Sequence, residues 1–282
     1  MKFIVDKRNY IIMFIIIVLI FWIITLSNNK PHIKSFKFED KVITYEIYEN
    51  ISERKVYNKI NNIYKEYENY DEKLNGKLDS NMLAFLEYGR ILYNKTNGYV
   101  DITSGDVISN IGNGYVYETK INDLTYKNDR LTSKINFNID NIMASYATGD
   151  VIDYFNLMGI KKYIINIDGD IIAGSKYSDK NYSISISDPS SSKVLKIVNF
   201  QNKSMTTLSG ENMVNLKTSS LEKLYDTVVV ISDDILTSNM VANNVYFLSI
   251  EEGKEVAKKF GSEILWYKDG QIYMTDNFSK YF

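Results

Sequence analysis

The chain of 282 residues contains no cysteine, a single histidine and two prolines. Without cysteine it forms no disulfide, no thiolate metal site and no cysteine-linked lipid anchor, and cysteine-based catalysis is excluded. The histidine, His32, lies in the short linker after an apolar N-terminal stretch, so we expect no histidine-based acid-base chemistry in the folded part. A formal net charge of -2 and the absence of a long basic run argue against nucleic acid as a partner.

The N-terminal stretch Tyr10–Leu26 carries no charge and is about long enough to cross a bilayer as a helix. Three basic residues and one acidic residue precede it, so the positive-inside rule places the N-terminus in the cytoplasm. Ser27–Pro31 offers no small-residue cleavage site, which favours a retained signal anchor over a cleaved signal peptide. The segments that we predict are a cytoplasmic N-terminus (1–9), a transmembrane signal anchor (10–26), a linker (27–32) and a folded extracytoplasmic domain (33–282). The protein is therefore expected in the cell membrane, as a single-pass protein.

Hydrophobic patterns in the remainder alternate between helical and extended spacing, which predicts an α+β domain of mixed sheets packed with helices. From Ala147 to Met158 the apolar residues recur at helical spacing, and Gly159 stands where a helix C-terminal cap is expected. Other elements predicted from such patterns are strands over 33–48, 130–139, 163–167 and 182–187, and helices over 52–74 and from about 234 to 247.

Three motifs occur in an order that resembles one enzyme family, the ApbE-like FAD:protein FMN transferases. Thr96-Asn-Gly-Tyr-Val-Asp-Ile-Thr103 resembles the family's Thr-Gly-Gly-Ala-Phe-Asp-Ile-Thr segment. Asn166-Ile-Asp-Gly-Asp-Ile171 is similar to its Asn-x-Gly-Gly-Asp-Ile turn, and Met205-Thr-Thr-Leu-Ser-Gly210 to its Ala-Thr-Ser-Gly. The resemblance spans roughly residues 40 to 276 and implies an ApbE-like flavin-transferase domain.

The resemblance also implies which positions bind ligands. The residues that it places at FAD are Thr44, Tyr99, Val100, Asp101, Thr103, Asp140, Ser145, Ser209 and Gly210. A Mg²⁺ site would use a main-chain carbonyl among Ile142 to Ala144, represented by Ile142, together with Asn239 and Asn243. Family members carry Asp and Thr, one helical turn apart, where this chain has the two asparagines, so the spacing is kept but the negative charge is not. A family histidine is also missing from the segment Val214–Ser219, and no catalytic residue is assigned.

The function implied by the resemblance is Mg²⁺-dependent transfer of FMN from FAD to a threonine or serine of an extracytoplasmic flavin-acceptor protein. The altered metal and histidine positions leave an alternative open, namely a binding module that holds FAD or a partner without catalysing transfer. An anchored α+β domain without a ligand is a third possibility. The carboxylates considered as replacements for the missing charge are Asp170, Asp188, Asp226 and Asp233.

Overall fold

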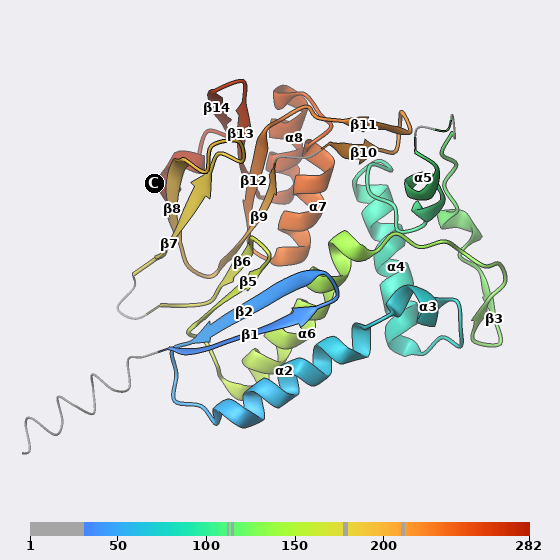
Figure 1. Ribbon diagram of the computed structural model, residues 1–282, viewed down its shortest axis with the longest axis horizontal. Helices are drawn as coiled ribbons and strands as arrows, with labels where there is room; N and C mark the ends of the chain where they lie inside the picture. Colours follow the sequence, from blue (N-terminus) through green and yellow to red (C-terminus); the bar gives the residue numbers. More distant parts are fainter. Residues whose placement is uncertain (1–30, 112, 114–115, 177–179, 210–211) are drawn as a thin grey trace, which may run out of the picture.

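The computed structural model describes residues 31–111, 113, 116–176, 180–209 and 212–282 (Figure 1). The predicted signal anchor at 10–26, the cytoplasmic segment before it and Gly210 lie outside the described residues. Within the described ranges, no helix combines the length and apolar character needed to cross a membrane. The first strand begins at His32, which is one residue inside the predicted linker.

Helices and strands occur in separate runs along the chain, as expected for an α+β domain. The helices are α2 (Glu53–Tyr67), α3 (Tyr70–Leu74), α4 (Ser80–Lys95), α5 (Gly105–Asn110), α6 (Asp140–Met158), α7 (Ile235–Val245) and α8 (Ile250–Phe260), with short 3₁₀ turns η1 (Ile121–Asp123) and η3 (Phe278–Tyr281). The strands are β1 (His32–Phe38), β2 (Lys41–Ile47), β3 (Tyr126–Lys127), β4 (Arg130–Leu131), β5 (Tyr163–Ile167), β6 (Asp170–Ala173), β7 (Tyr182–Ser187), β8 (Val194–Phe200), β9 (Lys203–Ser209), β10 (Met213–Asn215), β11 (Ser220–Glu222), β12 (Thr227–Ser232), β13 (Glu263–Lys268) and β14 (Gln271–Met274).

An eight-stranded antiparallel sheet in the order β1-β2-β5-β6-β9-β12-β13-β14 forms the centre of the molecule. Helices α2, α6 and α7 pack on one face, and the β7–β8 hairpin and η3 pack on the other (Figure 1). Each face therefore has its own hydrophobic core, and the sheet lies between them.

Strand β12 shows how one stretch of sequence serves both cores. All six of its residues are buried. Val228 and Val230 belong to the core under the helices, whereas Val229 and Ile231 belong to the core under the β7–β8 hairpin. Because successive side chains of a strand point to opposite faces, a continuous apolar run is what a strand covered on both sides requires.

Helix α6 and the hairpin that follows it confirm the sequence prediction. Gly159 adopts a left-handed conformation with φ 69°, and the N–H of Ile160 donates to the carbonyl of Phe155 at 2.8 Å, which closes the helix. Strand β5 then turns into β6 through two residues with positive φ, Asp168 at 49° and Gly169 at 105°. This tight turn places Asp170, the first residue of β6, next to α7.

The helix predicted over 52–74 is two helices in the structure. Helix α2 ends at Tyr67. Asn69 breaks the helix because it adopts a left-handed backbone conformation with φ 52°. Asparagine tolerates this conformation better than most residues. The apolar spacing continues across the break, so Tyr70 and Leu74 are still buried and the pattern did not reveal the interruption.

The strand predicted over 130–139 is wrong beyond Leu131, where β4 ends. The main-chain groups of Ile135 bond to the side chain of Asn75 and not to a neighbouring strand. The Asn75 Nδ2 donates to the Ile135 carbonyl at 2.8 Å, and its Oδ1 accepts from the Ile135 N–H at 3.0 Å. The N–H of Asn138 donates to the carbonyl of Ile102 at 2.8 Å. The alternation of apolar and polar residues over 134–139 therefore occurs in an irregular segment. The main-chain hydrogen bonds of Ile135 and Asn138 are made with Asn75 and Ile102, which lie outside any strand.

Gly253→Ala should destabilise the domain by about 1–3 kcal/mol, because its new Cβ would lie 2.5 Å from Cζ2 of the fully buried Trp266. Gly149→Ala in α6 is the matched control, since no atom lies within 4 Å of the added methyl group. Alanine favours a helix over glycine by about 0.5–1 kcal/mol, so this variant should be at least as stable as the parent. Urea unfolding of both variants measures the difference, and equal stabilities would contradict the packing described here.

Candidate functional site

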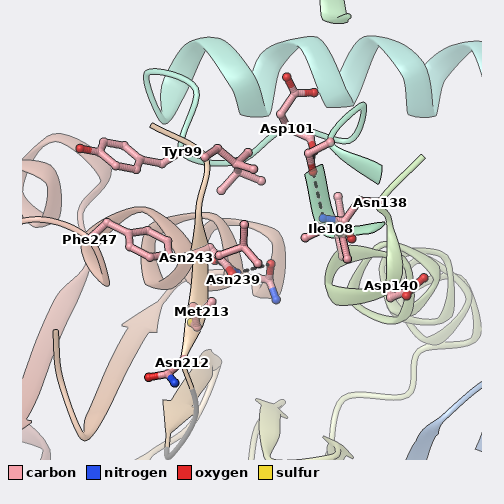
Figure 2. Close-up of a pocket in the computed structure, with 15 residues that line it drawn as sticks. Tyr99, Asp101, Ile108, Asn138, Asp140, Asn212, Met213, Asn239, Asn243 and Phe247 are labelled. Atoms are coloured by element: carbon pink, nitrogen blue, oxygen red, sulfur yellow. Dashed lines mark hydrogen bonds between the residues drawn. The ribbon is translucent and has the colours of Figure 1, made fainter. Parts of the chain in front are cut away.

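A pocket of about 360 Å³ opens between helices α5, α6 and α7 and the β10 strand (Figure 2). Its walls come from the loop after α4, from α5, from the first turn of α6, from the β10 hairpin and from α7 with the residues that follow it. These segments are far apart in the sequence. The sheet and helices therefore bring together positions that no single motif contains.

The pocket gathers most of the site residues predicted from the sequence. Those that line it are Tyr99, Val100, Asp101, Asp140, Ile142, Asn239 and Asn243. Thr103 and Ser145 are buried and lie within three residues of Asp101 and Ile142 along the chain, but they do not line the pocket. Thr44 lies in β2, where its hydroxyl bonds to that of Ser35 at 2.8 Å, and Ser209 is exposed at the end of β9. The structure thus separates Thr44 and Ser209 from the pocket lining.

Asp101 is a buried carboxylate whose oxygens both have protein partners. Oδ1 accepts from the N–H and the hydroxyl of Thr103, each at 2.7 Å. Oδ2 accepts from the hydroxyl of Thr119 at 2.5 Å and from the hydroxyl of Tyr117. Asp101 therefore shapes the wall of the pocket by joining two loops, and its carboxylate is occupied within the protein.

Asp101→Asn should lower the free energy of unfolding by about 2 kcal/mol, because hydrogen bonds to a buried charged acceptor are lost and an amide N–H then faces hydroxyl donors. Asp123→Asn, at an exposed position in η1, makes the same change of charge and should be nearly neutral. Denaturant unfolding compares the two. Equal stability of both variants would show that the four hydrogen bonds at Asp101 contribute little.

Two aromatic rings stand at one end of the pocket (Figure 2). The rings of Tyr99 and Phe247 are nearly parallel, with an interplanar angle of 9° and centroids 5.8 Å apart. The ammonium group of Lys217 lies 5.6 Å from the centroid of the Tyr99 ring. A flat aromatic ligand can stack on such a surface, and a cation beside it favours negatively charged groups on the same ligand.

Asn239 and Asn243 lie one turn apart on α7 and are joined to each other (Figure 2). Nδ2 of Asn243 donates to the main-chain carbonyl of Asn239 at 2.9 Å and to its Oδ1 at 3.2 Å. The Asn239 side chain in turn hydrogen-bonds to the carboxyl group of Asp170. The α7 pair predicted from the sequence is therefore continuous with an acidic residue of β6.

Asp170 is the residue whose place in the site the sequence did not establish. Its Oδ1 accepts from the N–H of Thr207 at 3.2 Å. Part of the residue reaches solvent, but protein atoms surround its carboxyl group, and this desolvation raises the pKa of Asp170 to about 6. Its position in Asn166–Ile171, a motif already matched to the family, was a signal in the sequence, but it did not distinguish Asp170 from the other carboxylates considered.

Asp140 lies at the first position of α6, where it faces other acidic groups. The residue is exposed, and its pKa is raised by partial burial of the carboxyl group and by the negative charges of Asp40 and Asp71. The positive charge of Lys41 opposes this shift and also lowers the pKa of Asp170. Asp140 therefore brings a negative charge to the pocket wall at α6, whereas Lys217 brings a positive charge to the Tyr99 ring.

The predicted metal positions provide oxygen donors but little charge. In the part of the chain that the structure describes, no three His, Cys, Asp or Glu side chains converge on a common point. The amide oxygens of Asn239 and Asn243 and the carboxylate of Asp170 are hard oxygen donors, which is the class that Mg²⁺ takes. The donor set therefore fits Mg²⁺ in kind when Asp170 is counted with the two asparagines.

Comparison with known proteins decides the family. The model of the ApbE family matches residues 32–266, which is most of the chain. The chain belongs to the ApbE family. No curated protein matches the sequence.

Solved structures show that the chain shares the ApbE fold. The flavin transferase ApbE from Vibrio cholerae is 15% identical, with a TM-score of 0.74, and the match covers 90% of this chain and 99% of that one. The flavinyl transferase ApbE from Pseudomonas stutzeri is 18% identical, with a TM-score of 0.73 and coverage of 90% and 98%. The ApbE protein from Thermotoga maritima is 14% identical, with a TM-score of 0.75 and coverage of 89% and 99%. The ApbE-like α+β domain expected from the motifs is thereby confirmed.

Proposed function

We propose that this protein transfers FMN from FAD to a threonine or serine hydroxyl of an acceptor protein. The observation that carries the proposal is the pocket of an ApbE-family fold that brings Tyr99, Asp140, Asn239 and Asn243 to one place. The names of the solved relatives support flavin transfer as the reaction of this fold.

The proposed reaction is a phosphoryl transfer. The hydroxyl oxygen of the acceptor attacks the phosphorus of the FMN half of FAD, the bond to the bridging pyrophosphate oxygen breaks, AMP leaves, and the hydroxyl proton is released. Such a reaction depends mainly on positioning and on neutralising phosphate charge. Bound Mg²⁺ would supply that neutralisation, held by the oxygens of Asn239 and Asn243.

Residues of the chain itself have three tasks in this proposal. The Tyr99 and Phe247 rings hold the flat part of the dinucleotide by stacking. Lys217, beside Tyr99, attracts the phosphates. The Asp101 network fixes the loop that carries Tyr99, so that the ring keeps its position when no ligand is bound.

We further propose that the acceptor is an extracytoplasmic flavoprotein and that the protein reaches it from the membrane. The support for this is the uncharged run Tyr10–Leu26 and the basic residues before it. A membrane anchor would hold the domain close to acceptors in the same membrane, which raises their effective concentration.

A second candidate function is FAD binding without transfer. It is favoured by the bond between Asn243 and Asn239, which shows that the amide groups at the metal positions can satisfy each other. In that case the pocket would hold FAD, and the acceptor would gain no covalent FMN.

Intact-mass measurement of an acceptor separates the two functions. The full-length protein in detergent is incubated with FAD, Mg²⁺ and a small acceptor protein that carries an exposed threonine. We expect the acceptor to gain the mass of one FMN less one water, which is the difference between FAD and AMP. FMN in place of FAD is the control, because it has no AMP to release and should give no adduct. No adduct from FAD, together with FAD binding seen by fluorescence, would support the second function; neither adduct nor binding would contradict both.

A further inference from the structure

Asp170 occupies an unusual electrostatic position. It is the first residue of β6, and its carboxyl group is enclosed by the turn before it, by the end of β9 at Thr207 and by α7 at Asn239. Its two polar partners, the Thr207 N–H and the Asn239 amide, are both neutral. In the described ranges no lysine or arginine forms an ion pair with it, and Lys41 acts on it only at longer range.

A carboxylate removed from water is unfavourable unless a positive charge compensates it. The Thr207 N–H and the Asn239 amide offset only part of that cost, because neither partner carries a charge. A cation next to Asp170 would offset the rest. None of the described side chains forms an ion pair with this enclosed carboxylate. Its surroundings therefore indicate a position for a bound cation.

Suitable ligands surround that place. Oδ1 of Asn239 is 3.2 Å from Nδ2 of Asn243, and Asn239 also touches Asp170, so the three side chains form one connected group. Asparagine oxygen and nitrogen atoms exchange positions by a rotation of the amide, so both amides can present oxygen to an ion. Mg²⁺ is commonly bound by one or two carboxylates and completed by substrate phosphates.

We propose that Asp170 provides the carboxylate ligand of a divalent-cation site that Asn239 and Asn243 complete with amide oxygens and FAD completes with phosphate oxygens. The inference rests on the proposed function, because FAD is the ligand whose phosphates close the site. The negative charge at this site then comes from Asp170 on β6, which is hydrogen-bonded to Asn239 on α7. The acidic group that the motif on α7 lacks is thus supplied by the turn motif Asn166–Ile171.

Binding of Mn²⁺, followed by electron paramagnetic resonance with saturating FAD, tests this assignment in the full-length protein. Asp170→Asn should weaken Mn²⁺ binding by about tenfold or more, because the site loses its charged ligand while the side-chain shape is kept. Asp168→Asn is the matched control. It changes an exposed aspartate two residues away in the same turn, and should alter Mn²⁺ affinity by less than about twofold.

The double variant Asp170→Asn with Asn239→Asp moves the carboxylate across the hydrogen bond to α7. It should recover most of the Mn²⁺ affinity lost in Asp170→Asn, a rescue that a merely structural role of Asp170 would not produce. The inference is overturned if the parent binds no Mn²⁺, if Asp170→Asn binds it as the parent does, or if the double variant shows no recovery.

Two further readouts keep this inference separate from the proposed function. FAD fluorescence without metal reports whether each variant retains a folded pocket, and the acceptor mass reports transfer. Transfer by the parent without any metal would overturn the metal site and leave the proposed function standing. Mn²⁺ binding through Asp170 without FMN transfer would support the metal site and contradict the proposed function.

Discussion

Asn239→Asp should strengthen Mg²⁺ binding by about tenfold to hundredfold, because it places a second carboxylate on the ion where the parent offers a neutral amide. The same change should destabilise the metal-free protein, since two carboxylates would then face each other in the space that Asn239 and Asp170 now share. The variant is therefore expected to melt at a lower temperature than the parent without metal and to gain more from Mg²⁺. Thermal unfolding with and without Mg²⁺, together with calorimetric titration, measures both effects.

Asn156→Asp is the control for this prediction, because it makes the same change of charge at an exposed position near the end of α6. Its Mg²⁺ affinity and its response to metal should match those of the parent. If Asn239→Asp behaved like Asn156→Asp, the metal would have to lie elsewhere in the pocket, and the assignment of Asn239 and Asn243 would be wrong.

The elements that the sequence predicted best are those with both a periodic apolar face and an explicit end. Helix α6 ends at a glycine in the left-handed conformation, and the hairpin after it turns through Asp168 and Gly169. Local chemistry determines both ends. The break at Asn69 has no such signal, because the apolar positions of α2 and α3 continue across it in helical register. Asparagine tolerates both the right-handed and the left-handed conformation, so the sequence does not indicate which one Asn69 adopts.

The site was predictable where family motifs carry it and unpredictable where long-range hydrogen bonds decide. The spacing of Asn239 and Asn243 on α7 sufficed to place both in the pocket. Asp101 was expected at the ligand, but its carboxylate serves Tyr117 and Thr119, which follow it at a distance that no local pattern marks. The role of a polar residue depends on the hydrogen-bond partners that the fold places next to it. The sequence shows only the residues adjacent to it along the chain.

Asp170 could not be selected by sequence from the four carboxylates considered, because its partners are set by long-range packing. Asp188 bonds to the serines that follow it, and Asp226 and Asp233 form ion pairs with lysines, so each of these three already has local or charged partners. Asp170 alone among the four is enclosed beside α7 with neutral partners. That distinction depends on the packing of β6 against α7, which appears only in the folded chain.

Tyr99→Ala should weaken FAD binding by about tenfold to hundredfold, because stacking of a base or flavin on an aromatic side chain contributes about 1–3 kcal/mol. The ring that is lost is half of the parallel pair with Phe247, and its removal also leaves Lys217 without the surface that it lies over. Quenching of flavin fluorescence on titration measures the affinity. Tyr99→Phe keeps the ring and should retain nearly all of the binding, which separates stacking from any role of the hydroxyl group.

Tyr273→Ala is the second control, since Tyr273 is an exposed tyrosine on β14 whose hydroxyl bonds only to Gln271 among the described residues. It should bind FAD as the parent does. A loss in Tyr99→Ala that Tyr273→Ala does not share would place the aromatic end of the pocket at the flavin or the adenine. Equal affinities of all three variants would mean that FAD, if bound, lies away from the Tyr99 and Phe247 rings. The reaction proposed here would then need a different pocket, because the oxygen donors of α7 open into the same cavity as these rings.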